Sequence, residues 1–466
     1  MLFNSFVFIA LFLPLTLLAF WLAPGDRGKR VVLLATSLFF YGYFHWPYLT
    51  LLVGLVGVAW ACALAAEKHR GTAPVWIAAV LLLGVLAYFK YAGFLATVAA
   101  DLGLAGSGSR RLHALALPIG ISFIVFQALG YVIDVHRGEF PAERRFSVVL
   151  LFKAFFPQLI AGPICRAHEL MPQLRQQFRF DPVQFFSGLG IFAVGLLLKE
   201  VFADGLAPLV DTLYASGTGT PTRIDAWAAA IGFGGQIYAD FWGYSTMAVG
   251  LARMFGVDIP VNFRLPYLAT SLREFWRRWH ITLSQWLRDY LYKPLGGSRH
   301  GTTRTILVLM ATMLLGGLWH GANYTFLIWG AIHGGVQVLE HLLRGKGEPA
   351  APAARWASRI LGWSYVFVVV MVAWVFFRAQ NVGQAVTIVK AMFVGGPTES
   401  VSGTVRQIFA LSAVLFVVQV PVERFLEGLR QARIAPPLAL AASFWSVVAA
   451  VVLGAPAAVP FIYFQF

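Results

Sequence analysis

The sequence is poor in charge and in cysteine. Of its 466 residues only 12% are charged and 59% are hydrophobic, whereas a soluble domain carries about a quarter charged residues. A soluble globular fold is therefore excluded. The two cysteines, Cys62 and Cys165, both lie in apolar surroundings, and no Cys-x-x-Cys or metal-type Cys/His spacing is present. The sequence thus predicts neither a structural disulfide nor a metal site.

Several catalytic signatures are missing as well. There is no Gly-x-Ser-x-Gly elbow, no Walker-type phosphate loop and no His-Glu-x-x-His. Serine hydrolase, ATPase and zinc protease functions are therefore poorly supported. The net charge of +15 comes from Lys and Arg spread over short segments between apolar runs. That distribution is typical of cytoplasmic loops in a lipid bilayer, and we expect no nucleic-acid partner.

Long, continuous apolar runs are what the sequence does contain. A helical span needs about 20 apolar residues, whereas a barrel would show short strands of alternating polarity. We predict an all-α polytopic membrane protein with roughly 10–13 transmembrane and re-entrant helices, forming one domain over 1–466. The candidate spans are 2–23, 31–45, 48–66, 74–99, 114–133, 147–163, 183–203, 226–251, 303–319, 324–343, 357–377, 406–422 and 438–455.

Some segments need a more specific interpretation. Leu2–Ala23 has no basic region before it and no small-residue cleavage site, so we interpret it as the first span and not as a signal peptide. The candidate 147–163 is short enough to be re-entrant or to lie flat. The stretches 204–225 and 345–355 are rich in Gly, Thr and Pro or in charge, and we predict loops there.

The region around 271–291 is the least membrane-like. It predicts one amphipathic helix lying in the membrane interface. The apolar stripe consists of Leu272, Phe275, Trp276, Trp279, Leu283, Trp286, Leu287 and Tyr290, and the polar face of Arg273, Arg277, His280, Ser284 and Arg288. Two roles stay open: anchoring to anionic lipid, or lining the mouth of a reaction chamber and holding an anionic substrate.

Histidines at the ends of apolar runs are the best candidates for chemistry. His320 follows the uncharged run 306–319 and precedes another, 324–332, and His333 lies just beyond. Ionisable groups at membrane depth are costly and usually face a polar cavity, although a buried histidine can also be purely structural. A neutral imidazole can accept the proton of an attacking hydroxyl, which fits acyl transfer from a thioester to an alcohol. Asn323 could donate to the developing oxyanion or make an ordinary interhelical hydrogen bond.

Three long strings then point to a family. They are QIYADFWGYS (236–245), FWRRWHITLSQWLRDYLYKPLGGSR (275–299) and MLLGGLWHGANYTFLIWGAIHG (313–334). The sequence in these strings closely resembles the membrane-bound O-acyltransferase family, and within it the bacterial alginate O-acetyltransferase branch. The resemblance is strong over about 120–345 and extends plausibly over the whole chain, including the C-terminal string FIYFQF (461–466).

The resemblance implies a ring of transmembrane helices around a thin centre with a central tunnel. It implies that His320 is catalytic and that His280 matches a second histidine motif. The string Arg288-Asp289-Tyr290 matches another shared motif, and so does Gly162-Pro163-Ile164 followed by Arg166. One departure stands out. Relatives read DFSGYSDMA where this chain has Trp242 and Thr246, which leaves the role of this segment, and the identity of the polymer, open.

We therefore predict an enzyme of the bacterial inner (cytoplasmic) membrane. It would move an acetyl group from a cytoplasmic thioester, such as acetyl-CoA, across the membrane to an exported polysaccharide such as alginate. Transfer would be direct or would pass through a periplasmic SGNH-type acetyltransferase partner. No bound cofactor is expected, and the donor could be another acetyl thioester.

Each candidate residue has a predicted role in this reaction. His320 is the predicted general base, and His280 would assist it or orient the donor. Asp289 could fix a histidine tautomer. The remaining donor-binding or supporting candidates are Arg277, Arg278, Arg288, Trp319, Tyr290, His333 and Asn323.

Two kinds of alternative function are kept. The first is D-alanyl transfer to teichoic acid by an enzyme of the same family, which would use a carrier protein as donor. The second is a non-enzymatic transporter or scaffold of a polymer-export complex, since broken, Gly-rich helices with midplane polar groups also occur in transporters. No pair of interrupted helices repeats in the two halves of the sequence, which argues against a transporter.

Overall fold

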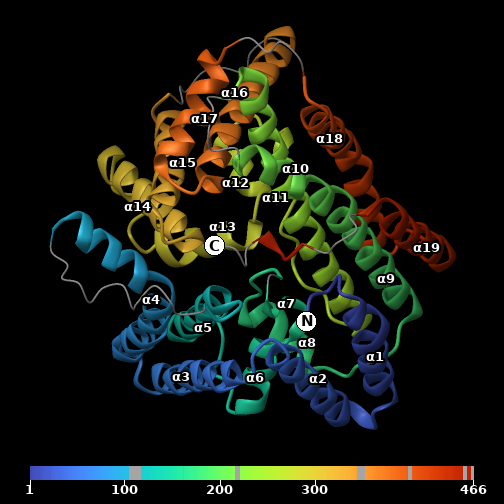
Figure 1. Cartoon of the computed structure of the whole chain (residues 1–466). Helices are drawn as coiled ribbons and strands as arrows, with labels where there is room; N and C mark the ends of the chain where they lie inside the picture. Colours follow the sequence, from blue (N-terminus) through green and yellow to red (C-terminus); the bar gives the residue numbers. More distant parts are fainter. Residues whose placement is uncertain are drawn as a thin grey trace. The chain divides into compact units, whose positions relative to one another are not determined.

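The regular secondary structure of the described residues is entirely helical. This computed structural model describes residues 1–103, 117–160, 162–215, 221–343, 352–396, 401–454 and 459–462, and the regular elements within them are all helices (Figure 1). The N-terminal half contains η1 (Phe8–Phe12), α1 (Leu13–Leu22), α2 (Gly25–Gly42), α3 (Pro47–His69), α4 (Ala73–Asp101), α5 (Ile121–His136), α6 (Phe146–Ala154), α7 (Phe156–Leu159), α8 (Ala167–Arg175), α9 (Pro182–Leu197), η3 (Leu198–Ala203), α10 (Asp204–Ala215) and α11 (Arg223–Met254). The C-terminal half contains η4 (Pro266–Leu268), α12 (Leu272–Arg278), α13 (Ile281–Leu287), η5 (Arg288–Tyr292), α14 (Thr302–His320), α15 (Tyr324–Leu342), α16 (Pro352–Arg378), α17 (Val382–Val394), α18 (Gly403–Arg430) and α19 (Pro436–Leu453). The predicted all-α class is confirmed.

The described residues form two compact units. Unit 1 comprises Met1–Ala193, Tyr244–Pro260 and Ala432–Ser443, and unit 2 comprises Val194–Gly243, Val261–Gln431 and Phe444–Phe466. In unit 1, α3, α4 and α5 pack on one another, and α6 packs against α2 and α8. In unit 2, α14 and α15 form a hairpin, α16 packs on α15, and α10 packs on α18.

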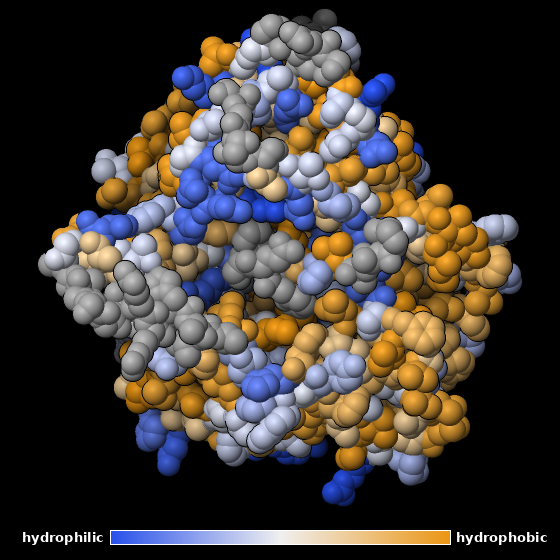
Figure 2. Space-filling model, in the orientation of Figure 1, coloured by the Kyte–Doolittle hydropathy of each residue, from blue (hydrophilic) through white to orange (hydrophobic). Residues whose placement is uncertain are grey.

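Seven helices among the described residues are long and apolar enough to cross a bilayer. They are α3, α4, the continuous helix Pro182–Ala215, α14, Trp356–Arg378 of α16, α18 and α19. Their outer faces carry large exposed apolar side chains, such as Trp76, Val417 and Val451, and hydrophobic residues cover much of the surface seen in Figure 2. Because water would penalise such a surface, it fits contact with lipid, and the predicted multi-pass membrane protein is confirmed.

Three predicted segments turn out differently. The candidate span 147–163 is broken into α6 and α7 at Phe155, and a nine-residue helix rises only about 14 Å, too little to cross a membrane. The predicted loop 204–225 is wrong over 204–215 and from Arg223 onward: η3 carries the preceding span on into α10, and α11 begins at Arg223. Residues 216–220 lie outside the described residues. Of the predicted loop 345–355, residues up to 351 lie outside the described residues, and α16 already begins at Pro352.

Close backbone contact locks the hairpin of α14 and α15. A methyl group added at Gly330 would lie 2.5 Å from the carbonyl oxygen of Met313, and one added at Gly317 would overlap the carbonyl of Phe326. Small residues let transmembrane helices approach in this way, so van der Waals packing replaces the hydrophobic effect that lipid cannot supply. The hairpin therefore fixes the separation of the residues it carries, among them His320 and His333.

Candidate active site

The predicted amphipathic helix over 271–291 is interrupted, which corrects the sequence prediction. α12 ends at Arg278, Trp279 is extended, and His280 has a left-handed backbone with φ 42° and ψ 56° before α13 begins at Ile281. The break turns His280 away from the polar face on which the helical period places it. Its side chain is fully buried, so the predicted place of His280 on the polar face of a continuous helix is wrong.

Asn262 stabilises this break. The backbone N–H of Ile281 donates to the carbonyl of Asn262 over 3.0 Å, and the hydroxyl of Thr282 donates to the Asn262 side-chain oxygen over 2.7 Å. These bonds satisfy donors that the first turn of a helix leaves free. A left-handed backbone at a residue with a side chain costs about 1–3 kcal/mol and tends to occur at functional sites. Sequence reasoning missed Asn262 because its partners lie about 20 residues away.

The start of α12 is fixed to α15. Ser271 caps α12 by accepting from the backbone N–H of Glu274 over 3.1 Å. The carboxylate of Glu340 on α15 accepts from the backbone N–H of Leu272 over 2.5 Å and from that of Arg273 over 3.2 Å. Burial alone raises the pKa of Glu274, but hydrogen bonds from Thr270 and Arg278 outweigh it, so its pKa lies below the usual value.

Histidine and tryptophan rings alternate at the centre of unit 2. We call His280, Trp319, His320, Trp329 and His333 the histidine–tryptophan cluster. The ring centroids of His280 and Trp319 lie 6.0 Å apart, those of Trp319 and His320 5.0 Å, those of His320 and Trp329 5.0 Å, and those of Trp329 and His333 4.6 Å. Helices α14 and α15 and the α12–α13 break thus bring together all three predicted histidines.

His320 is held by rings on three sides. It is 3% exposed at the end of α14, and its ring also packs edge-on against Phe377 of α16 at 5.1 Å. Edge-to-face packing of this kind fixes the orientation of the imidazole ring without using its nitrogen atoms. A general base needs its imidazole in the neutral state, with one ring nitrogen free to accept a proton.

His333 lies in an aromatic cage with several unsatisfied polar atoms. Its ring is 5.2 Å from that of Trp276 and 4.6 Å from that of Trp329. Both ring nitrogens of His333 and the indole N–H groups of Trp276 and Trp329 are buried, with no hydrogen-bond partner among the described residues. Buried polar atoms without partners cost free energy, and in native proteins they often mark functional positions.

Asn323 has a structural role at the start of α15. It is the N-cap of α15, and its side-chain oxygen accepts from the backbone N–H of Thr325 over 3.1 Å. Its amide nitrogen donates to the carbonyl of Gln380 over 3.2 Å. The side chain therefore joins α15 to the segment that follows α16, the second of its two predicted uses. A role towards an oxyanion stays a prediction.

The predicted donor-binding arginines lie on α12 and η5, and they differ in whether they form ion pairs. Arg277 is exposed, whereas Arg278 is ion-paired with Glu274 at 2.6 Å. Arg288 is mostly exposed and pairs with its neighbour Asp289 at 2.9 Å. Asp289 also pairs with Lys293 at 2.7 Å, so both of these ion pairs are to basic side chains. A role of Asp289 in fixing a histidine tautomer stays a prediction. Tyr290 packs on Trp286 at 5.1 Å.

Comparison with known proteins decides the family. The family described as "MBOAT, membrane-bound O-acyltransferase family" matches residues 145–380. The chain is 42% identical over 399 residues to the "Probable alginate O-acetylase AlgI" of Azotobacter vinelandii, covering 84% of this chain and 78% of that protein. The chain belongs to the membrane-bound O-acyltransferase family. It is therefore a multi-pass membrane enzyme that transfers acyl groups to oxygen. The family membership argues against the alternative hypotheses of a non-enzymatic transporter or scaffold.

Two further relatives set the range of similarity for this O-acyltransferase. The "Peptidoglycan O-acetyltransferase" of Helicobacter pylori is 34% identical over 428 residues, covering 84% of this chain and 80% of that protein. The "Teichoic acid D-alanyltransferase" of Streptococcus thermophilus is 26% identical over 290 residues, covering 56% of this chain and 68% of that protein. Similarity is thus greater to the two O-acetylating relatives.

A buried charge cluster of the O-acyltransferase escaped sequence reasoning. Lys199 on η3 pairs with Asp204 at 2.5 Å and with Asp240 on α11 at 2.8 Å, and all three side chains are at most 3% exposed. Removing one partner of a buried pair costs about 3–5 kcal/mol. The only sequence signal was charge at the end of an apolar run. Trp242, one of the residues that departs from the relatives, stacks on Tyr238 at 5.0 Å.

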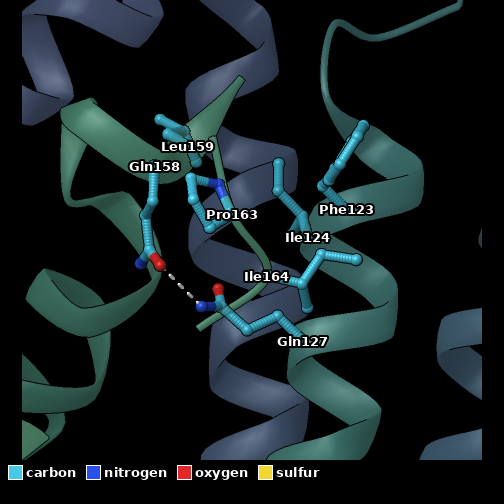
Figure 3. Close-up of a pocket in the computed structure, with 7 residues that line it drawn as sticks. All are labelled: Phe123, Ile124, Gln127, Gln158, Leu159, Pro163 and Ile164. Carbon is cyan, nitrogen blue, oxygen red and sulfur yellow. Dashed lines mark hydrogen bonds between the residues drawn. The ribbon is translucent and has the colours of Figure 1, made fainter. Parts of the chain in front are cut away.

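The motif Gly162-Pro163-Ile164 lies in unit 1 beside an open pocket. Phe123, Ile124, Gln127, Gln158, Leu159, Pro163 and Ile164 line this pocket of about 230 Å³, which includes the solvent at its mouth (Figure 3). The amide of Gln127 donates to Gln158 over 3.0 Å and to the carbonyl of Cys165 over 2.9 Å. Arg166 is the N-cap residue of α8 (Ala167–Arg175), and its backbone N–H donates to the carboxylate of Glu169 over 2.7 Å. These contacts brace the motif within unit 1.

Proposed function

We propose that this O-acyltransferase moves an acetyl group from a cytoplasmic thioester, such as acetyl-CoA, to a hydroxyl of an exported polysaccharide. His320 acts as the general base. The observation that carries the proposal is the histidine–tryptophan cluster, in which His280 and His320 flank Trp319 at 6.0 and 5.0 Å in the buried centre of unit 2. Both histidines come from the strings through which the chain resembles its family.

The chemistry needs one base at the accepting hydroxyl. The imidazole of His320 takes the hydroxyl proton while that oxygen attacks the thioester carbonyl and forms a tetrahedral intermediate. The C–S bond then breaks, the acetyl group stays on oxygen, and the imidazolium returns its proton to the leaving thiolate. His280 assists His320 or orients the donor from across Trp319, and general-base catalysis by His320 contributes about 10²–10⁴-fold to the rate.

The basic edge of the site suits an anionic donor. Arg277 and Arg288 are exposed, and Arg278 lies between them in sequence. Guanidinium groups match phosphate geometry by forked hydrogen bonds, so these residues hold the phosphates of a CoA-type donor. Arg277 is the best candidate for binding the donor phosphates, because Arg278 and Arg288 already pair with Glu274 and Asp289.

The acceptor is an exported glycan. Two relatives carry the names "Probable alginate O-acetylase AlgI" and "Peptidoglycan O-acetyltransferase", and both names describe O-acetylation of a glycan polymer. We infer that the enzyme lies in the bacterial inner membrane, with alginate as the first polymer to test. A periplasmic SGNH-type acetyltransferase partner completes transfer if the acetyl group does not pass directly.

D-alanyl transfer to teichoic acid is the second candidate. The identity of 26% to a D-alanyltransferase against 42% to an alginate O-acetylase makes it the weaker one. The two differ in the donor, so purified enzyme should be offered radiolabelled acetyl-CoA and, separately, a D-alanylated carrier protein. Acyl transfer from the carrier protein alone would overturn the acetyl proposal.

The decisive test is polysaccharide O-acetylation in cells that carry wild type, His320→Ala or His280→Ala, with membrane abundance measured for each. His341→Ala is a matched control, because His341 lies on α15 but is exposed. We expect acetyl on the polymer to be lost for His320→Ala at normal abundance, strongly reduced for His280→Ala and unchanged for the control. Unchanged acetylation in His320→Ala would reject His320 as the base.

A further inference from the structure

The last described residues of the chain enter the interior of unit 2. Phe461 and Ile462 are 1% and 2% exposed. The carbonyl of Val459 accepts from the ammonium of Lys199 over 2.9 Å, and the backbone N–H of Ile462 donates to the carboxylate of Asp240 over 2.6 Å. The segment 459–462 is thus held at both ends by the buried charge cluster.

This cluster gives a firm anchor. The ammonium of Lys199 contacts the carboxylates of Asp204 and Asp240 and donates to the carbonyl of Val459. The other carboxylate oxygen of Asp240 accepts from the backbone N–H of Ile462. Charge-assisted hydrogen bonds are about twice as strong as neutral ones, more so where water is excluded. Loss of the segment would leave Lys199 and Asp240 each short of one bond.

A path of rings runs from this anchor to His280. Phe461 packs on Phe241 with centroids 5.7 Å apart, and Phe241 packs edge-on against His280 at 4.6 Å and 86°. Phe241 directly follows Asp240, so the anchor and the ring that contacts His280 belong to adjacent residues. The edge-on contact with Phe241 restricts rotation of the His280 imidazole and so helps to set its direction.

We propose that Phe241 is a positioning residue for His280 and that the segment 459–462 holds Phe241 in place. This inference rests on the proposed role of His280 in acyl transfer. Phe241 acts through His280 alone: it fixes the plane of the imidazole, and it touches neither donor nor acceptor. The C-terminal segment, through Phe461, keeps the ring of Phe241 from turning aside.

The first test replaces Phe241 by leucine in the purified full-length enzyme. Leucine keeps most of the apolar volume and removes the flat edge-on contact. Phe20→Leu in unit 1 is the matched control: Phe20 is fully buried, and among the described residues its ring contacts are Trp21, Phe178 and Phe255. We expect kcat per folded enzyme to fall about 10–100-fold for Phe241→Leu with the donor KM unchanged. Equal losses in both variants would overturn the proposal.

A double variant separates this inference from the proposed function. If Phe241 acts through His280, then Phe241→Leu added to His280→Asn lowers the rate no further than His280→Asn alone. A full further loss in that background would overturn the positioning role. A normal rate in His280→Asn alone would reject the role of His280, and with it the positioning role, while leaving the test of His320 intact.

The C-terminal part of the inference has its own variant. Phe461→Leu keeps the backbone bonds of Val459 and Ile462 and removes the ring contact with Phe241. We expect a fall in kcat of about 3–10-fold, smaller than for Phe241→Leu and absent in the Phe241→Leu background. A loss that adds fully to that of Phe241→Leu would show that the segment acts by another route.

Discussion

Unit 1 and unit 2 each bury polar groups around a motif shared with the family, but they treat those groups differently. In unit 1, the amide of Gln127 bonds Gln158 and a backbone carbonyl, and the amide of Gln158 donates to the carbonyl of Phe152 over 2.5 Å. In unit 2, His333, Trp276 and Trp329 have buried polar atoms without a partner among the described residues.

This difference in hydrogen bonding distinguishes polar groups that stabilise the fold from polar groups that are available for a reaction. A network whose amides bond to one another and to backbone stabilises one conformation, whereas unsatisfied groups cost free energy and need another reason to be there. Lys153 of unit 1 is buried without a hydrogen bond to any described residue, but its ammonium lies 4.2 Å from the centroid of the Phe152 ring, and this cation–π contact offsets part of its burial. The contrast supports the proposal that acyl transfer takes place in unit 2 and that unit 1 gives structural support.

The largest expected effect is at His320. His320→Gln in purified enzyme should lower the acyl-transfer rate about 10²–10⁴-fold, because the general base is lost. The thermal midpoint in detergent should stay close to wild type, since glutamine retains a polar side chain of similar length. A normal rate would remove the contrast between the two units.

Gln127→Leu in unit 1 should act on stability instead. It leaves Gln158 and the carbonyl of Cys165 without their donor, which costs about 1–3 kcal/mol. We expect a lower thermal midpoint with unchanged specific activity of the folded fraction. Loss of specific activity at normal stability would show that unit 1 takes part in the reaction.

His333→Phe should give the reverse pattern. Phenylalanine keeps the ring that packs on Phe275, Trp276 and Trp329 and removes two unsatisfied nitrogens. Stability should be unchanged or higher, while the rate falls about tenfold if the imidazole serves the reaction. A lower thermal midpoint with full activity would assign His333 a structural role.

The smallest effect is expected at the exposed edge. Arg277→Gln should raise the donor KM about 2–5-fold in low salt and less in high salt, because exposed charges are screened. Arg406→Gln, an exposed arginine on α18, is the control. Equal KM values for the two variants would exclude Arg277 from donor binding.

Much of the fold could be predicted from composition. Low charge and long apolar runs identify a helical membrane protein, and most helix positions follow from them. The helix over 204–215 was missed because Gly205, Pro208 and several polar residues look like a loop, although Pro208 is tolerated inside α10. Burial against α18 and the charge cluster outweighs this local preference.

The site was predictable only in part. The strings around His280, His320 and His333 identify the histidines, and the structure brings all three into one cluster. The position of His280 could not be predicted, since helical period assumes a continuous helix and the break depends on Asn262 in a distant part of the chain. Lys199 and Asp204 were missed for the same reason, because their partner Asp240 is remote in sequence.

The left-handed backbone at residue 280 has a consequence for engineering this enzyme. Glycine adopts that conformation without strain and asparagine adopts it readily. Asparagine relieves that strain while removing the imidazole, whereas glycine also leaves a cavity in this fully buried position. A redesign guided by backbone strain alone would replace His280 early, and would lose the imidazole in exchange for a relaxed backbone.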